Sequence, residues 1–538
     1  MQGFMHAEGK KIVDKDGCPI ILKGWGLGNW LLQEGYMWNA GGFTRFDRPR
    51  RIEQVVEELT GKTYAESFWK KYRENYIRQE DIQYMAKLGY NSVRIPFNWR
   101  ILMEEGEKLI WKEDGFLLLD QCIKWCEEEK VYAFLDLHGA PGGQTGANID
   151  DCVDDVPRLF TDQWAWEKGL ALWGKLAKRY ADCQYVGGYD LLNEPIAPHE
   201  EGEVNYDYLA PKLIRFYKEA IQEIRKHDKV HMISLEGMHW ATEPGIFTEK
   251  LDDNMVLHFH RYAEPPQKKC LDLFLEKAEE LQVPLWLGET GENINEWYAA
   301  LYPLAVSLGI GYNLWTWKKM NCTNSPCSIK MPTDYDKVLE YLKGGPHPGF
   351  AKSRKIFDEY LENILFENCE LHEEVTAHVF RKGTFELLAV DFDEMPGKGV
   401  SYAGRTGTKT YGYPVSDYRK NTGMTIVETE AKHEKYFAFD CLWDNLGLIL
   451  EEGEFAVYSL EECDKIVLEI RIVPGHRGAL VLEAGEQKGK EVEYGKRVEA
   501  EIGEIDSAVS VAFSGSKLSR IKICSTGGNI CLKRLVIR

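Results

Sequence analysis

Two glutamates that follow apolar, strand-like runs are the residues of this chain best placed to do chemistry. Glu194 comes shortly after the run 186–192, and Glu289 directly follows the run 283–288. Two carboxyl groups can cleave a glycosidic bond: a protonated one gives its proton to the leaving oxygen, and an ionised one attacks the anomeric carbon. A covalent reaction that retains configuration requires the two groups to lie about 5–5.5 Å apart. The fold must therefore bring positions 194 and 289 together.

The first part of the chain has the pattern that could do so. Short apolar runs alternate with longer amphipathic stretches, which predicts parallel βα units. Eight such units favour closure into a (β/α)₈ barrel, expected over residues 1–365, above an open doubly wound sheet. In front of the first run, 4–13 and 19–22 flank a turn at Asp16-Gly17 and predict a hairpin under the barrel. The eight runs are 21–26, 91–97, 131–137, 186–192, 230–235, 255–259, 283–288 and 310–315, and helical patterns cover 76–88, 115–129, 164–180, 206–227, 270–281 and 292–308.

Polar side chains recur where these runs end. Arg94 lies on the second run, His138 follows the third, and Trp315 ends the eighth. Catalytic groups of such barrels project from the carboxyl ends of the strands, so these residues are expected at one rim with both glutamates. One histidine at a strand end is most often structural, but polar groups on six strands together favour an active site.

The sequence around these residues resembles glycoside hydrolase family 5 over about the first two-thirds of the chain. The family resemblance is carried by Asn193-Glu194-Pro195, by Gly288-Glu289 and by NSVRIP at 91–96. The exo-β-1,3-glucanase-like branch of that family is closer still, and its motifs occur in order. They are GWGLGNWLLQE at 24–34, DLHGAPG at 136–142 and WTWK at 315–318.

This resemblance implies a retaining β-glycoside hydrolase in which Glu194 is the acid/base and Glu289 the nucleophile. Arg94 would keep the nucleophile ionised, because a neighbouring guanidinium lowers the pKa of a carboxyl group, and Tyr262 would orient it. The substrate is then a β-linked carbohydrate, and removal of terminal glucosyl units is expected. The remaining implied contacts are Asn193 to the sugar 2-hydroxyl, His138 and His260 along the sugar subsite, Trp315 as its stacking floor, and Glu34 at its non-reducing end.

The chain departs from that branch in two loops. The branch has an Asn after the His-Gly-Ala-Pro-Gly turn, whereas this chain reads QTGANIDD at 144–151, with Asn148 or Asp150 as replacements. The loop 318–335 has no counterpart, and the sixth run has an additional histidine, His258. An endo-β-glucanase or a β-mannosidase therefore stays open, and a non-catalytic carbohydrate-binding protein is the alternative from another class.

Composition excludes several classes of function. A formal net charge of −20 opposes binding to nucleic acid and to anionic membrane surfaces. Neither a signal-like start nor a run of about 20 apolar residues is visible. Thirteen Cys without a C-x-x-C pair predict reduced thiols and a cytoplasmic location. No dinucleotide, zinc or G-x-S-x-G motif is present, so we expect neither cofactor nor metal.

The pattern changes after residue 361, where helical periodicity stops. Short alternating segments predict an all-β sandwich, jelly-roll-like, over 371–538. This part resembles a family 6 carbohydrate-binding module, with Tyr418, Trp443 or Tyr494 as stacking faces and Asn529 as a sugar contact. Leu388, Val390 and Cys531 stand where such modules carry acids, so calcium is not expected. The alternative is that this domain is only structural. The expected strands are 374–380, 384–390, 455–460, 465–472, 479–483, 508–513, 521–524 and 532–537.

Overall fold

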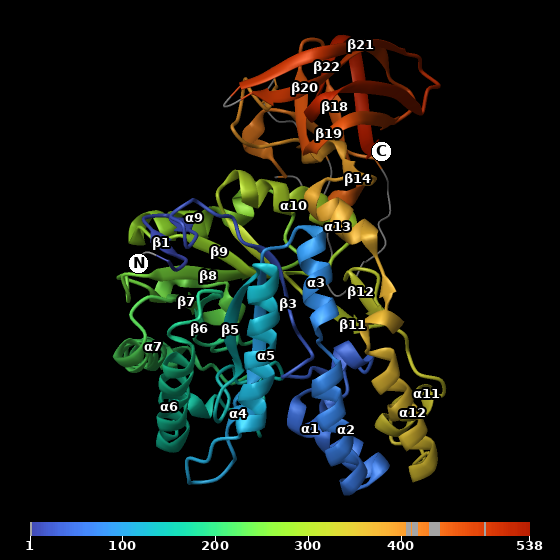
Figure 1. Cartoon of the computed structure of the whole chain (residues 1–538). Coiled ribbons are helices and arrows are strands. Elements are labelled where there is room, and N and C mark those ends of the chain that lie inside the picture. The colour runs from blue at the N-terminus through green and yellow to red at the C-terminus, as the bar shows by residue number, and fades with distance from the viewer. Residues whose placement is uncertain (1–2, 405–409, 412–417, 430–441, 489–490) are drawn as a thin grey trace. The chain divides into compact units, whose positions relative to one another are not determined.

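The computed structural model describes residues 3–404, 410–411, 418–429, 442–488 and 491–538 (Figure 1). The chain forms two compact units. The first comprises Met1–Arg261, Phe274–Thr290 and Ile310–His372. The second comprises Tyr262–Leu273, Gly291–Gly309 and Glu373–Arg538, so it includes two segments that lie in sequence between barrel strands.

The first unit contains a closed eight-stranded barrel, which confirms the predicted fold class. The strand order is β10-β3-β4-β5-β6-β7-β8-β9, and the pairs from β3 to β9 are parallel. Each of the eight predicted runs contributes one strand. The strands are β3 (Lys23–Gly26), β4 (Ser92–Asn98), β5 (Tyr132–Gly139), β6 (Val186–Asp190), β7 (Met232–Glu236), β8 (Met255–Arg261), β9 (Leu285–Gly291) and β10 (Gly311–Trp315).

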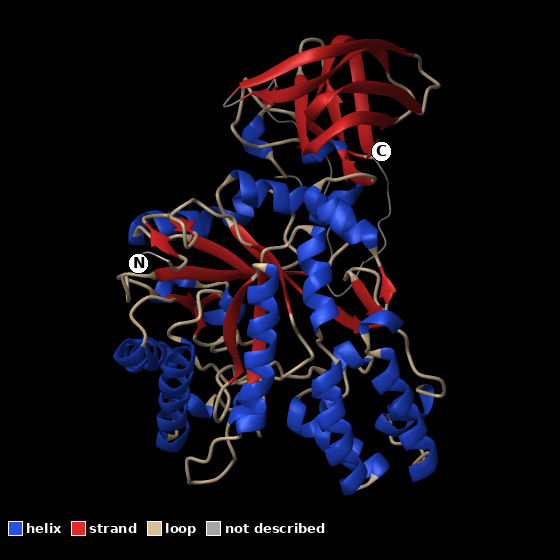
Figure 2. Cartoon of the chain, viewed as in Figure 1, coloured by secondary structure: helices blue, strands red, loops and turns tan. Residues whose placement is uncertain are grey.

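Amphipathic helices surround these strands (Figure 2). In α7 (Ala210–His227) the buried residues Leu213, Phe216, Tyr217 and Ile224 repeat at helical spacing and cover the sheet. The sequence pattern did not predict the pair α1 (Pro49–Thr60) and α2 (Lys62–Asn75). The other helices of residues 1–372, apart from α10, are α3 (Gln79–Leu88), α4 (Trp99–Leu102), α5 (Glu113–Glu129), α6 (Gln163–Tyr180), α8 (Met238–Ala241), α9 (Asp272–Leu281), α11 (Asp336–Leu342) and α12 (Phe350–Asn363).

The predicted N-terminal hairpin with its turn at Asp16-Gly17 is present, and a shorter hairpin precedes it. β1 (His6–Glu8) pairs with β2 (Lys11–Val13), so the chain first reverses at Gly9-Lys10. A second reversal follows, where Val13 bridges Pro19. Met5 and Ile12 of the hairpin join a buried cluster with the strand residues Phe134, Met232 and Trp286. The hairpin thus buries apolar side chains of the barrel interior, as expected.

The second unit is built on one nine-stranded sheet, in agreement with the predicted all-β domain. Its longest strands are β19 (Phe455–Ile472) and β22 (Ala508–Ile537), and Leu468 pairs with both Val511 and Ile537. β22 therefore flanks β19 on both sides, which curls the sheet around its own core. The other strands are β14 (Phe385–Leu388), β15 (Tyr402–Ala403), β16 (Thr410–Tyr411), β17 (Thr425–Glu428), β18 (Leu446–Leu450), β20 (Arg477–Lys488) and β21 (Glu491–Ile502).

One predicted strand of this unit is wrong. Residues 374–380 form part of α13 (Glu373–Phe380), whose buried residues Val375, Thr376 and Val379 repeat at helical spacing. Helix α10 (Asn295–Ser307) also belongs to this unit.

A small sheet of β11 (Lys318–Met320), β12 (Cys327–Ile329) and β13 (Glu370–Leu371) completes the first unit. Among the described cysteines no disulfide is formed, and no described helix combines the length and apolar character needed to cross a membrane.

Two of the three aromatic residues proposed as sugar-stacking faces are in the core of the sheet domain. Tyr418 is 1% exposed and Trp443 is 0% exposed, and both donate hydrogen bonds to Oδ1 of the buried Asp391. Buried rings cannot stack on a sugar in solution, so this interpretation is wrong for both. Tyr494 is partly exposed. Asp417, which precedes Tyr418 in the sequence, lies outside the described residues.

Candidate active site

Arg94 on β4 is the centre of the hydrogen-bond network inside the barrel mouth. Its side chain is fully buried. Nε donates to Oδ2 of Asp190 at 2.8 Å, Nη1 to Oε2 of Glu289 at 2.5 Å, and Nη2 to Oδ1 of Asn193 at 2.7 Å. Burial alone would lower the pKa of Arg94, but the surrounding carboxylates raise it well above the usual value of an arginine. The guanidinium therefore provides a fixed positive charge beside Glu289.

Two further acidic side chains complete the shell around this arginine. Nη2 of Arg94 lies 3.0 Å from Oε1 of Glu236 and 3.2 Å from Oδ2 of Asp136. Burial raises the pKa of Asp136 well above its usual value, and Arg94 opposes this only in part. Burial likewise raises the pKa of Glu236. Arg94 thus forms ion pairs with several carboxyl groups, and the pKa values of these groups differ from one another.

Glu194 and Glu289 converge on one point at the ends of β6 and β9. One carboxylate oxygen of each, together with a ring nitrogen of His260, all lie within 4.8 Å of one another. The two glutamates are 8% and 6% exposed. This separation is compatible with the 5–5.5 Å between carboxyl groups that retaining cleavage needs, and it leaves little room for the water that an inverting enzyme holds between them.

The backbone of Glu194 is held in an uncommon conformation. Its φ is +43°, in the left-handed region that residues with a side chain adopt only where their surroundings hold them. Its N–H donates to Oε2 of Glu236 at 2.6 Å. Glu236, at the end of β7, therefore binds Arg94 with one oxygen and the backbone of Glu194 with the other.

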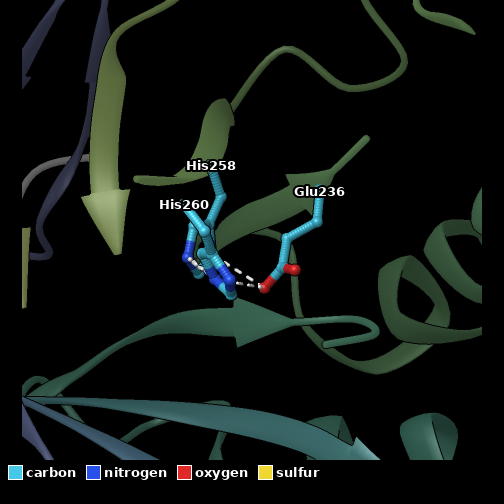
Figure 3. Close-up of side chains that lie close together, drawn as sticks. All are labelled: Glu236, His258 and His260. Atoms are coloured by element: carbon cyan, nitrogen blue, oxygen red, sulfur yellow. Dashed lines mark hydrogen bonds and ion pairs between the residues drawn. The ribbon is translucent and has the colours of Figure 1, made fainter. Parts of the chain in front are cut away.

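The rings of His260 and the additional His258 lie side by side, and the carboxylate of Glu236 lies close to both (Figure 3). Nδ1 of His260 lies 2.6 Å from Oε1 of Glu194, and its Nε2 lies 3.1 Å from Nε2 of His258. Nδ1 of His258 then meets Oγ of Ser234 at 3.0 Å and Oδ2 of Asp190 at 3.2 Å. When His260 is charged, its Nε2 carries a proton and donates it to Nε2 of His258. Nε2 of His258 is then the acceptor, so the proton of the His258 ring lies on Nδ1.

His138 forms a separate and electrically neutral side of the site. Its Nδ1 lies 2.8 Å from Oδ2 of Asp136, and its Nε2 accepts from the amide nitrogen of Asn193 at 3.2 Å. Burial, together with nearby Arg94, lowers the pKa of His138 to about 3. The ring stacks on Trp315 with centroids 5.2 Å apart and planes 1° apart.

Trp315 is positioned by the glycines of the first motif. A Cβ at Gly26 or at Gly28 would lie 2.6 Å from the indole ring, so only glycine leaves room for it. The indole Nε1 donates to the hydroxyl of Tyr36 at 2.8 Å. The GWGLG motif thus has a packing role, and Glu34, 6% exposed, ends the same segment.

The structure brings eight of the nine predicted site residues into the first unit. Tyr262 is the exception, since it begins the second unit directly after β8, and its predicted role stays a prediction. Sequence reasoning missed Asp136, Asp190 and Glu236 as members of the network. The signal was available, because each lies at or near the carboxyl end of a predicted strand.

Polar side chains of the loop 144–151 form hydrogen bonds with the backbone of His138 and Asn193 and within the loop itself. Nε2 of Gln144 donates to the carbonyl oxygens of His138 and Asn193, at 2.7 and 2.9 Å. The carboxylate of Asp150 is buried and accepts from the N–H groups of Gln144 and Thr145. Asp150 therefore supports the loop from within, and does not face a substrate.

Two groups of side chains have the residue types of a metal site. They are Glu236 with His258 and His260, and Glu194 with His260 and Glu289. Oε1 of Glu236 already accepts from Arg94 at 3.0 Å, and Oε2 of Glu289 accepts from the same guanidinium at 2.5 Å. A resident cation would be repelled by this buried positive charge, so the donor set fits a proton network better than a metal.

The barrel segment matches known glycosidases. Residues 54–321 match the family model described as Cellulase (glycosyl hydrolase family 5). A beta-xylosidase from Phanerodontia chrysosporium is 31% identical over 262 residues, which are 48% of this chain and 52% of that protein. A glucan 1,3-beta-glucosidase from Candida oleophila is 26% identical over 329 residues, 56% of this chain and 73% of its own. The chain spans about half the length of the beta-xylosidase. A solved endogalactoceramidase aligns over 98% of this chain and 99% of its own, with 14% identity and a TM-score of 0.48.

Proposed function

We propose that this chain, whose barrel is a glycosyl hydrolase family 5 domain, is a retaining β-glycoside hydrolase that removes terminal glucosyl units from short β-glucosides or oligosaccharides. One observation carries the proposal: carboxylate oxygens of Glu194 and Glu289 lie within 4.8 Å of each other, on two strands of one barrel. Relatives named as a beta-xylosidase and a glucan 1,3-beta-glucosidase support a β-glycosidase, and a relative named as an endoglucanase keeps endo action as the alternative.

In the first step Glu289 attacks the anomeric carbon while Glu194 gives its proton to the leaving oxygen. Arg94, 2.5 Å from Oε2 of Glu289, favours the ionised nucleophile and neutralises part of its charge. In the second step Glu194, now ionised, takes a proton from a water molecule, which releases the sugar from Glu289 with its original configuration. Two inversions at the same carbon give net retention.

The sugar undergoing cleavage would lie between Asn193 and Trp315. Asn193 gives its Oδ1 to Arg94 and one N–H to His138, so its amide nitrogen has a second N–H for the sugar 2-hydroxyl. Trp315 would stack on the apolar face of the ring. We further propose that Glu34 bonds hydroxyls at the non-reducing end and that Tyr262 orients Glu289.

The sheet domain would have a structural role and no sugar site of its own. Two of its three stacking candidates, Tyr418 and Trp443, are buried and bonded to Asp391. The domain also holds α10, whose Ala299 carbonyl accepts from Nε of Arg381 at 2.7 Å. A cytoplasmic location remains part of the proposal and rests on the thirteen cysteines of the sequence.

The test is turnover of 4-nitrophenyl β-D-glucoside by the full chain, followed by NMR of the first-formed sugar. The expected product is β-glucose, which then mutarotates. α-Glucose as first product would contradict retention, and no release of nitrophenol from any aryl β-glycoside would favour a binding protein. The panel includes β-xylosides and β-mannosides, and reducing-end-labelled oligosaccharides separate exo from endo action.

A further inference from the structure

A cavity of the first unit is lined by α1, by α2 and by the segment 100–112, together with Phe350. Its volume is about 940 Å³, which is the size of a site for a small molecule. None of the nine site residues predicted from the sequence is among the described residues that line it. The cavity is therefore a place for a ligand other than the sugar that is cleaved.

Three buried nitrogen donors of this lining have no hydrogen-bond partner among the described residues. They are Nε1 of Trp69, Nε of Arg73 and Nη2 of Arg100. Trp69 and Arg73 lie four positions apart on α2, which places them on one face of that helix, and Arg100 lies on α4. Buried donors are nearly always paired, so three unpaired donors from the lining of one cavity indicate a place built for an acceptor.

Positive charge gathers around the same residues. Nη1 of Arg100 donates to Oε2 of Glu53 at 2.9 Å, whereas Nη2 of Arg73 lies 3.7 Å from Oε1 of that carboxylate. Nζ of Lys112 donates to the carbonyl oxygen of Arg100 at 2.7 Å and so brings a third cation to this pair. Glu53 is thus the carboxylate between two arginines, and its contact with Arg73 is too long for a hydrogen bond.

The second carboxylate near these cations is also shared. Nε of Arg100 pairs with Oδ2 of Asp151, and Nε of Arg50 lies 3.4 Å from Oδ1 of the same residue. Two carboxylates, Glu53 and Asp151, therefore face four basic side chains. A net positive charge remains where Arg73, Arg100 and Lys112 meet.

The pKa values of two of these cations follow this excess. Burial lowers the pKa of Arg73; Glu53 raises it, and the charge of Arg100 lowers it further. Partial burial lowers the pKa of Lys112, and the charges of Arg73 and Arg100 add to this effect. The side chains of Arg73 and Arg100 are 24% and 15% exposed, so an anion in the cavity can reach them and relieve their repulsion.

A phosphate group suits three cations better than a carboxylate does. It carries a charge of about −1.5 to −2 at neutral pH and three oxygens that accept hydrogen bonds. A carboxylate has two oxygens, and a single guanidinium can bind both. Two arginines and a lysine therefore provide the charge and the donors of a phosphate site.

The remaining lining limits what the phosphate group can belong to. Beyond Glu53, the described residues that line the cavity include four more carboxylates, those of Glu57, Glu58, Glu66 and Glu105. These would repel a chain of phosphates, as in a nucleic acid or a nucleoside triphosphate. Hydroxyl groups, in contrast, can donate to them. A single phosphate group on a small molecule rich in hydroxyl groups fits both parts of the lining.

We infer that this cavity binds a phosphate monoester of a small hydroxylated molecule, such as a sugar phosphate, and that Arg73, Arg100 and Lys112 hold its phosphate group. The inference goes beyond the proposed function, because it assigns a second ligand to a separate cavity. It does not depend on turnover of any glycoside.

The experiment is calorimetry of the full chain with glucose 6-phosphate, with inorganic phosphate and with glucose, at one ionic strength set with sodium chloride. Wild type should bind glucose 6-phosphate more tightly than inorganic phosphate. Arg73→Gln and Lys112→Gln should each weaken that binding about 10-fold, the loss of a charge-assisted contact. Arg497→Gln makes the same charge change at a side chain that is 58% exposed and far from this lining in sequence, and it should leave the affinity unchanged.

No binding of glucose 6-phosphate to wild type would overturn the inference, as would equal losses in Arg73→Gln and Arg497→Gln. Inorganic phosphate that binds as tightly as glucose 6-phosphate would show that the ligand is not a monoester. Displacement of glucose 6-phosphate by glucose would place it in a sugar site and would also refute the inference. Circular dichroism checks that the variants are folded, and the exposed Lys112 provides the test if Arg73→Gln does not fold.

Discussion

Nδ1 of His260 lies 2.6 Å from Oε1 of Glu194, within the range in which two groups share a hydrogen-bonded proton. Burial alone would lower the pKa of His260, but the carboxylates of Glu236 and Glu289 and the hydrogen bond with Glu194 raise it well above 6.5. The imidazole is therefore charged at neutral pH. The acid/base is thus hydrogen-bonded to a positively charged ring.

Replacing the nucleophile tests the central assignment. Glu289→Ala should lower kcat on aryl glucosides by about 10⁵-fold, because no group remains to attack the anomeric carbon. Added azide should restore turnover and give α-glucosyl azide, since a small anion can occupy the emptied position and invert the carbon once. The measurement is NMR of the azide product. A variant with wild-type activity would show that Glu289 is not the nucleophile.

Replacing the acid/base should affect substrates unequally. Glu194→Ala should lower kcat/KM by about 10²–10⁴-fold for a poor leaving group such as methanol. For a dinitrophenyl glucoside, which leaves without a proton, the loss in the first step should be small. The slope of log kcat/KM against the pKa of the leaving group measures this difference. Equal losses across the series would remove Glu194 from the acid role.

The sequence predicted the barrel because its strands are continuous apolar runs. It predicted Arg94, His138, Glu194, Glu289 and Trp315 at one rim because they lie on those runs or where the runs end, and it predicted the other site residues through the family resemblance. It did not predict the role of Glu236, which depends on a left-handed backbone at Glu194 that places the N–H toward β7. It also predicted a strand at 374–380, where α13 forms, since short apolar segments fit both periodicities. Burial of Tyr418 and Trp443 could not be read from residue type, because aromatic rings fill cores and bind sugars alike.

His260 should stabilise the fold at low rather than high pH. Its pKa is raised in the folded protein, so the bound proton contributes stability fully below the unfolded value of about 6.5, and this contribution is lost as pH rises through the folded value. The difference in Tm between wild type and His260→Gln should therefore shrink as pH rises from about 5 to 9. Thermal melts across that range measure it. A difference that grows with pH would contradict the charged imidazole.

His138 should give the opposite trend. Its pKa of about 3 lies below the unfolded value of about 6.5, so the unfolded chain binds a proton that the folded chain does not. Because the folded protein keeps this ring neutral, its free energy of unfolding falls as pH falls from 6.5 toward 3, by up to about 1.4 kcal/mol per pH unit. His138→Gln should lose less stability on acidification than wild type. The exposed His199→Gln is the control and should follow wild type; a steeper loss in His138→Gln would refute the neutral assignment.

Arg381 should be essential to the second unit. The side chain is 3% exposed, and it donates from Nε to the Ala299 carbonyl on α10 and from Nη1 to the Ser459 carbonyl on β19 at 3.0 Å. Nη1 also lies 3.1 Å from Oδ1 of Asp393. Arg381→Met keeps the volume of the stem but leaves three carbonyls, those of Ala299, Ser459 and Asp391, and the carboxylate of Asp393 without this donor. We expect the free energy of unfolding to fall by about 3 kcal/mol, because breaking a buried ion pair strands its partner.

Arg477→Met is the matched control for this substitution. The Arg477 side chain is 80% exposed, and its ion pair with Glu504 is long, with Nη1 4.0 Å from Oε1. It should change the free energy of unfolding by less than about 0.5 kcal/mol. Urea denaturation of wild type and both variants, followed by tryptophan fluorescence and circular dichroism, provides the comparison. Similar midpoints for Arg381→Met and Arg477→Met would mean that α10 and the sheet do not depend on each other. The structural role proposed for the C-terminal domain would then lose its main support, because that role requires the sheet to hold a helix whose chain connects two strands of the barrel.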